Sequence, residues 1–204
     1  MPLRREIVEL DRAALRDEAA ATFGLDASRP VLLVFGGSLG ARRLNDTLAE
    51  SWPAIVGAGW QILHAAGERN ELVDSAHPDY RIVPYLDRMD LAFALADAVV
   101  ARSGAATVSE LTALGIPAVY VPYAVGNGEQ ALNAASAVAA GAARLIPDAE
   151  FTPDRVRGEV VPLLADPEAL GALRAAAEAS APAARAGTAA VVAQIDEVLG
   201  RSAR

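Results

Sequence analysis

The stretch that decides the fold is VLLVFGGSLGARRLN, residues 31–45. Its apolar start, residues 31–35, has the length of a buried strand. Gly36 and Gly37 predict a tight bend, and Ser38 stands where a helix is expected to begin. Backbone N–H groups in the first turn of a helix lack a partner within the helix and lie at the positive end of its dipole. The stretch therefore predicts a phosphate site, although an ordinary turn that binds nothing fits the same residues.

Outward from this stretch, short apolar runs alternate with helical patterns. We expect strands at 31–35, 60–65, 80–84, 98–101, 117–121 and 143–146. We expect helices at 7–23, 39–56, 87–96, 104–114, 130–140, 152–165, 167–180 and 188–199, and a short helix or loop at 68–75. The strands are apolar without alternation, which is typical of a parallel sheet covered on both faces. The pattern predicts one α/β domain with a doubly wound, six-stranded parallel sheet, in which ligands bind beyond the carboxyl ends of the strands.

Composition narrows the functions that this chain can have. Of 204 residues, 53% are hydrophobic, which is enough for a sizeable core, and the net charge of -8 argues against nucleic acid or an anionic membrane as the main partner. There is no cysteine, and all 18 basic residues are arginine, so thiolate and lysine chemistry are excluded. His64 and His77 are too far apart to predict a metal site. We expect no cofactor, no metal and, without a signal peptide or transmembrane run, a cytoplasmic protein.

Polar and small residues follow the other predicted strands. RSGAATVSE, residues 102–110, repeats the pattern of strand end, glycine and helix start, and two such starts suit a diphosphate. Glu110 could accept hydrogen bonds from ribose hydroxyls or be a solvated helix residue, and Arg102 could bind an anion or tie loops together. After the fifth strand, Glu129, Gln130 and Asn133 could bracket sugar hydroxyls or only cap a helix.

Three motifs together resemble the MurG family of UDP-N-acetylglucosamine transferases, which convert lipid I to lipid II in peptidoglycan synthesis. They are GGSLGARRLN, ARSGAATVSELTALGIPAVYVPY, and NGEQALNA followed by GAA, and the NGEQ form resembles the actinobacterial branch. The opening PLRREI resembles the segment that enters the C-terminal domain of this family. The resemblance implies a Rossmann-like sheet and the C-terminal half of a GT-B glycosyltransferase. We therefore expect residues 1–204 to form a single UDP-sugar-binding domain, with the N-terminal acceptor domain absent.

The resemblance also implies roles for individual residues. The diphosphate would lie on Gly36, Gly37 and Ser38, with further phosphate and sugar contacts from Ala105, Ala106 and Thr107. Uracil would be enclosed by Tyr85, Leu86 and Met89, near Arg4, and ribose would be held by Glu110. The N-acetylglucosamine hydroxyls would be read by Glu129 and Gln130, in the cluster that includes Asn133. The chain departs from the family at Leu39, where Gln is usual, and at Glu129, where other branches have His or Gln.

The activity that the resemblance implies is an inverting hexosyl transfer. A hydroxyl of lipid I would attack the anomeric carbon of UDP-GlcNAc as UDP leaves, without a metal ion and with no catalytic residue in these 204 residues. Lipid I would bind through the missing domain, at the cytoplasmic face of the membrane. In isolation the chain could instead be a UDP-sugar-binding module without turnover. A third reading, a dinucleotide-binding oxidoreductase domain, is weaker because the G-x-G-x-x-G spacing is absent.

Overall fold

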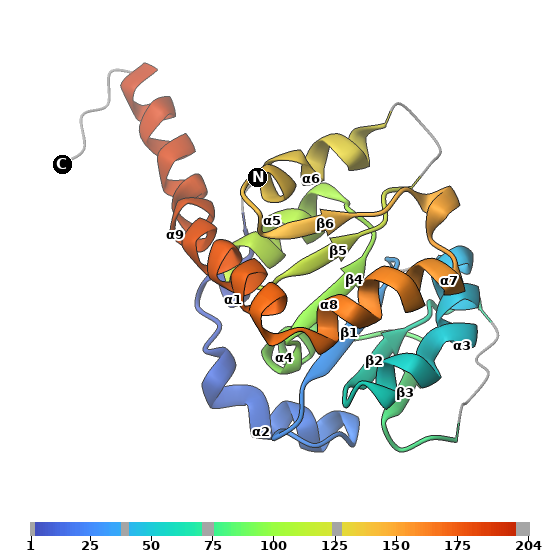
Figure 1. Ribbon diagram of the computed structural model, residues 1–204. Coiled ribbons are helices and arrows are strands. Elements are labelled where there is room, and N and C mark those ends of the chain that lie inside the picture. Colours follow the sequence, from blue (N-terminus) through green and yellow to red (C-terminus); the bar gives the residue numbers. More distant parts are fainter. Residues whose placement is uncertain (1–2, 38–40, 71–75, 124–127, 199–204) are drawn as a thin grey trace.

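The strand β1 (Val31–Phe35) is buried along its whole length and lies inside the sheet. The computed structural model describes residues 3–37, 41–70, 76–123 and 128–198, with side chains up to residue 187. In these residues β1 is joined by β2 (Gln61–Ala65), β3 (Tyr80–Val83), β4 (Ala98–Ala101), β5 (Ala118–Tyr120) and β6 (Ala143–Leu145). All pairings are parallel, and the strand order is β3-β2-β1-β4-β5-β6 (Figure 1). The predicted doubly wound, six-stranded parallel sheet is confirmed.

The order of the strands places the site. The chain builds outward from β1 to β2 and β3, then returns to pair β4 with the other side of β1, with Leu33 beside Val99 and Phe35 beside Ala101. The direction of winding therefore reverses between β1 and β4. At such a reversal the loops after the two strands diverge to opposite faces of the sheet, and a crevice opens at their carboxyl ends.

Helices cover both faces of the sheet (Figure 1). The first face packs against α3 (Arg42–Gly57), the π-helical η2 (Val156–Val160) and α8 (Val161–Ala165), and the short α7 (Pro153–Arg155) contacts α3. The second face packs against α1 (Arg5–Val8), α2 (Arg12–Phe23), α4 (Met89–Leu95), α5 (Ala105–Leu114) and α6 (Glu129–Ala139). The 3-10 turn η1 (Asp148–Glu150) follows β6, and α9 (Pro167–Val198) packs along α5 and extends beyond the rest of the molecule.

Side chains of β1 enter two separate cores. Val31, Leu33 and Phe35 pack into the cluster under α2, α4 and α5. Leu32 and Val34 pack into the cluster under α3 and α8. Because successive side chains of a strand point to opposite faces, an unbroken apolar run is required where both faces are covered.

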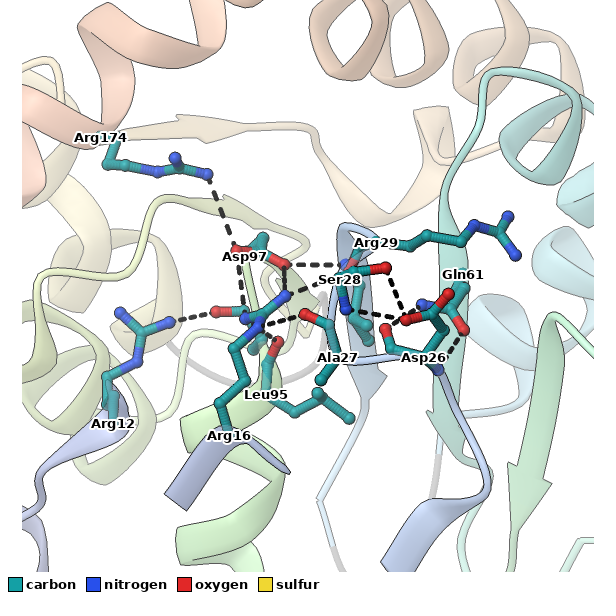
Figure 2. Close-up of polar contacts among 12 residues, drawn as sticks. Arg12, Arg16, Asp26, Ala27, Ser28, Arg29, Gln61, Leu95, Asp97 and Arg174 are labelled. Atoms are coloured by element: carbon teal, nitrogen blue, oxygen red, sulfur yellow. Dashed lines mark hydrogen bonds and ion pairs between the residues drawn. The ribbon is translucent and has the colours of Figure 1, made fainter. Parts of the chain in front are cut away.

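At the amino ends of the strands, Asp97 is the centre of a polar network (Figure 2). Its Oδ2 accepts from Arg16 Nη2 at 2.9 Å and from the N–H of Val31 at 3.0 Å. Arg16 also donates to the carbonyl of Leu95, and Arg12 donates to the carbonyls of Phe93 and Ala96. These arginines of α2 satisfy carbonyls at the end of α4, which have no partner within that helix. The network fixes the edge of the sheet opposite the crevice.

Some predicted helix boundaries are wrong. The helix expected at 7–23 is divided into α1 and α2, because the Asp11 side chain accepts from the N–H of Ala14 at 3.0 Å and begins a new helix. The helices expected at 167–180 and 188–199 form one helix, α9, despite Pro182. The helix expected at 152–165 contains the π-helical η2. Residues 38–40 and 71–75, where a helix start and a short helix or loop were predicted, lie outside the described residues.

Candidate functional site

A cleft of about 840 Å³ lies beyond the carboxyl ends of β1, β4 and β5. Its walls come from the turn after β1, the first turns of α3, the strand ends of β4 and β5, the start of α6, and the segment from η1 to α7. The lining residues are Gly36, Gly37, Ala41, Arg42, Arg43, Asp46, Thr47, Glu50, Arg102, Tyr123, Gln130, Asp148, Phe151, Thr152 and Pro153. The cleft therefore occupies the crevice that the strand order creates.

The helices that follow β1, β4 and β5 begin without side-chain caps. The N-cap residues of α3, α5 and α6 are Ala41, Gly104 and Gly128, and none of them provides a capping side chain. In contrast, Asp11 caps α2, and Asp166 accepts from two N–H groups in the first turn of α9. The open N–H groups and the dipoles of α3, α5 and α6 give this edge of the sheet the chemistry of an anion site.

Two glycines at this edge have a backbone conformation that other residues rarely adopt. Gly37 has φ of 97° and Gly128 has φ of 78°. A Cβ at either position would meet nothing within 4 Å among the described residues, so glycine is required by the backbone and not by lack of space. The turns before α3 and before α6 thus depend on these glycines.

Arg4 and Glu110, both predicted near the nucleotide, contact each other. Arg4 donates from Nε at 3.1 Å and from Nη2 at 2.9 Å to Oε1 of Glu110. The Glu110 side chain is 13% exposed and that of Arg4 is 60% exposed. Glu110 is therefore neither fully solvated nor unpaired, and the pair joins the segment before α1 to α5.

The three residues predicted to enclose uracil have different environments. Tyr85 is 47% exposed, whereas Leu86 is 7% exposed and belongs to the core under α4 and α5. Met89 is the first residue of α4 and packs against the same core. Only Tyr85 among the three therefore presents a large surface to a ligand.

Arg102 ties loops together at the wall of the cleft. Its Nη1 donates to the carbonyls of Val121 at 3.0 Å and Pro122 at 3.2 Å and lies 2.5 Å from Oδ1 of Asp148. Its guanidinium carbon lies 5.4 Å from the centre of the Tyr123 ring. Of the two roles open from the sequence, the structure shows the tying one.

The start of α6 is held to the ends of β4 and β5. The Gln130 side chain accepts from the N–H of Tyr123 at 2.9 Å, and Asn133 Nδ2 donates to the carbonyl of Ser103 at 3.1 Å. Glu129 is exposed at the first position of the helix. Of these three predicted sugar contacts, Gln130 lines the cleft.

His64 is a satisfied core residue. Asn45 Nδ2 donates to the carbonyl of Ala66, which leaves its Oδ1 to accept from His64 Nε2 at 3.0 Å. His64 Nδ1 then accepts from the Tyr80 hydroxyl at 2.8 Å. Burial lowers the pKa of His64 to about 4, so the ring is neutral. In the part of the chain that the structure describes, no three His, Asp or Glu residues gather as a metal site, and no helix is long and apolar enough to cross a membrane.

The cleft contains some of the predicted site residues and several that the sequence analysis did not propose as ligands. Gly36, Gly37 and Gln130 line it, and Ser38 lies outside the described residues. Arg4, Tyr85 and Glu110 do not line it, nor do Leu86, Met89, Ala105, Ala106, Thr107, Glu129 and Asn133. Asp148 was missed, although it comes soon after β6 and the rule of reading strand ends applies to it equally.

Comparison with known proteins defines the class. Residues 31–191 match the family described as Glycosyltransferase family 28 C-terminal domain, and the chain belongs to this family. A crystal structure of Acinetobacter baumannii MurG is similar, with a TM-score of 0.72 and 25% identity over 94% of this chain and 55% of that one. The fold is thus that of the C-terminal domain of a GT-B glycosyltransferase.

Two curated relatives are more similar in sequence. Both are named UDP-N-acetylglucosamine--N-acetylmuramyl-(pentapeptide) pyrophosphoryl-undecaprenol N-acetylglucosamine transferase. The one from Clavibacter michiganensis subsp. michiganensis is 57% identical over 87% of this chain and 48% of its own length. The one from Leifsonia xyli subsp. xyli is 60% identical over 81% of this chain and 46% of its own length. The chain therefore spans about half the length of the curated relatives that it matches.

Proposed function

We propose that residues 1–204 form a single UDP-sugar-binding domain, the donor-binding half of an enzyme that transfers N-acetylglucosamine from UDP-GlcNAc to lipid I. One observation carries this proposal: the uncapped starts of α3, α5 and α6 lie at the carboxyl edge of one sheet, and the starts of α3 and α6 line one cleft there. The names of the relatives supply the donor sugar and the acceptor class.

The diphosphate is proposed to lie against the turn at Gly36 and Gly37 and the first-turn N–H groups of Ala105, Ala106 and Thr107. These groups are dipoles fixed before the reaction, so they would stabilise the negative charge that develops on UDP as it leaves. This stabilisation needs no metal ion.

The nucleoside is proposed to lie on the side of Arg4 and Glu110. Arg4 donates only to Oε1 of Glu110, and no other described residue donates to Oε2. Oε2 is therefore available to a ribose hydroxyl. Tyr85 would cover uracil with its exposed ring, supported by the buried Leu86 and the partly buried Met89. Ser38, Glu129 and Asn133 stay proposed contacts, with Gln130 on the sugar side because it lines the cleft.

Transfer is proposed to be inverting, with the lipid I hydroxyl attacking the anomeric carbon. The acceptor-binding site, the catalytic base and the contact with the cytoplasmic face of the membrane would be supplied by the other half of the relatives' length. The 204-residue chain alone would then bind the donor without turnover.

Titration calorimetry of the 204-residue chain with UDP, UDP-GlcNAc and NAD tests this proposal. We expect UDP and UDP-GlcNAc to bind and NAD to bind more weakly than either. Tighter binding of NAD than of UDP would contradict the assignment. Incubation with UDP-GlcNAc and a lipid I analogue tests the second part, because product formation by this chain would show that it is more than a binding module.

A further inference from the structure

The Gln130 side chain has only one orientation that satisfies its surroundings. Its Oε1 accepts from the backbone N–H of Tyr123 at 2.9 Å, and a backbone N–H can only donate. The oxygen is therefore used within the protein, and Nε2 makes no hydrogen bond to any residue described. Since Gln130 lines the cleft, the group that it offers there is a hydrogen-bond donor.

This orientation depends on the position of Tyr123, and Arg102 contacts Tyr123 and the two residues before it. The guanidinium of Arg102 lies against the Tyr123 ring at 5.4 Å from its centre, and it donates to the carbonyls of the two preceding residues, Val121 and Pro122. Arg102 is 9% exposed, so these contacts are shielded from water. The backbone from residue 121 to residue 123 thus has three contacts with one side chain.

Asp148 in turn holds Arg102. Its Oδ1 lies 2.5 Å from Arg102 Nη1, and its Oδ2 accepts from Arg43 Nε at 3.0 Å. The Asp148 side chain is 14% exposed, whereas that of Arg43 is 47% exposed. The carboxylate is therefore the main charge that compensates the buried guanidinium, and without it Arg102 would be drawn toward water.

We propose that Asp148 and Arg102 are positioning residues that orient Gln130 as a hydrogen-bond donor to a hydroxyl oxygen on the sugar of a nucleotide sugar. This inference rests on the proposed function and adds to it a mechanism of sugar recognition. Recognition of the sugar is then separate from recognition of the nucleotide. Affinity for the sugar depends on the series of contacts from Asp148 through Arg102 and Tyr123 to Gln130. Affinity for the nucleoside, at Arg4 and Glu110, does not depend on these contacts.

The test is the ratio of the affinities for UDP-GlcNAc and UDP, measured by calorimetry on the 204-residue chain. The variants are Asp148→Asn, which removes the charge and keeps the shape, and Arg102→Lys, which cannot donate in the same fork geometry. We expect each to lower the preference for UDP-GlcNAc by about fivefold or more, the factor for one lost hydrogen bond, and to change UDP affinity less than about twofold. Asp154→Asn is the matched control, because it removes one charge from an exposed ion pair with Arg157 and is expected to keep the wild-type ratio.

A second measurement does not depend on these variants folding. In the ¹⁵N–¹H spectrum of the wild-type chain, the Gln130 side-chain amide, assigned by its loss in Gln130→Glu, should shift with UDP-GlcNAc and not with UDP. An unshifted amide, or Asp148→Asn and Arg102→Lys variants with the wild-type ratio, would overturn the positioning role. Equal weakening of UDP and UDP-GlcNAc would do so too, because it is the result of a merely structural role. If the wild-type chain binds no UDP, the proposed function fails and this inference fails with it.

Discussion

Arg4 and Glu110 lie 106 positions apart in the sequence, yet two nitrogens of Arg4 donate to a single oxygen of Glu110. The arrangement orients the carboxylate, since Oε1 is occupied and Oε2 accepts from no residue that the structure describes. A mostly buried carboxylate with one oxygen that no described residue occupies is suited to a pair of vicinal hydroxyls, which donate to it. The proposed nucleoside side of the site is organised by this pair.

Replacing Glu110 by Ala should weaken UDP binding by roughly 1–3 kcal/mol, because hydrogen bonds to a charged group would be lost. Calorimetry with UDP measures the effect, with circular dichroism to verify folding. Glu9→Ala, which removes an exposed carboxylate paired with Arg5, is the matched control and should keep wild-type affinity. A folded Glu110→Ala variant with unchanged affinity would remove Glu110 from the proposed site.

The buried His64 predicts a pH dependence of stability. Its pKa is lowered to about 4 in the folded protein, below the ordinary value of 6.5, so between these values the unfolded chain binds more protons. The free energy of unfolding should therefore fall as the pH is lowered from 6.5 toward 4, by up to about 3 kcal/mol over the full range. Urea unfolding at pH 7 and pH 5 measures this dependence.

The variant His64→Gln keeps a polar side chain and cannot be protonated, so it should be less dependent on pH in the same interval. Its stability at pH 7 is expected to be lower, because the hydrogen bonds to Asn45 and Tyr80 are disturbed. An equally steep dependence in the wild type and in the variant would show that other groups cause it.

Replacing Asp97 should lower the stability of the fold without lowering the affinity for UDP. Asp97→Ala removes the acceptor for Arg16 and for the N–H of Val31 and should lower the free energy of unfolding by about 2–4 kcal/mol. Because this network lies at the amino ends of the strands, UDP affinity should stay unchanged. Denaturant unfolding and calorimetry together test both statements, with the exposed Asp17→Ala of α2 expected to change stability by less than about 0.5 kcal/mol. A weakened UDP affinity in folded Asp97→Ala would contradict the separation of the two edges.

Two glycines at helix ends offer a comparison that reports on the packing of α9. Gly115 has φ of 66° and Gly141 has φ of 75°, so Ala at either position is strained by about 1 kcal/mol. A Cβ at Gly115 would lie 3.1 Å from the backbone of Glu178 in α9, whereas at Gly141 its nearest neighbour is the Ala176 side chain at 3.8 Å. Thermal unfolding should therefore show a larger loss for Gly115→Ala than for Gly141→Ala. Equal losses of stability in the two variants would mean that α9 can move away from the added Cβ at Gly115 without a cost in free energy.

Local signals in the sequence were sufficient for the sheet. Each strand is a short apolar run, and each run lies between glycine, proline or polar residues, so the strands of the structure agree with the predicted ones to within two residues. The double coverage of the sheet followed from the lack of alternation in residues 31–35. Glycine before a helix start also located the edge at which the cleft lies.

Contacts between distant segments could not be read from the sequence. Nothing near Arg102 indicates that its charge is balanced by Asp148, because the two come together only when β6 has paired with β5. The continuous helix α9 was also missed: two helices were predicted, at 167–180 and 188–199, but the alanine-rich sequence around Pro182 favours helix, and Ala177 and Ala181 are buried. Asp11 is a residue type that commonly caps helices, but the apolar pattern continues past it, so a single helix was predicted where its side chain begins a new one.

The pairing of β1 with β4 divides the cleft between two parts of the chain. The Gly36 and Gly37 turn belongs to the part that contains β1 to β3, and Arg102 and Gln130 belong to the part that contains β4 to β6. A molecule in which either part has opened has lost one wall of the cleft, so it cannot hold the ligand. A bound nucleotide sugar would consequently slow amide hydrogen exchange in both parts by the same factor, and would make the opening of the sheet more cooperative than it is in the empty domain.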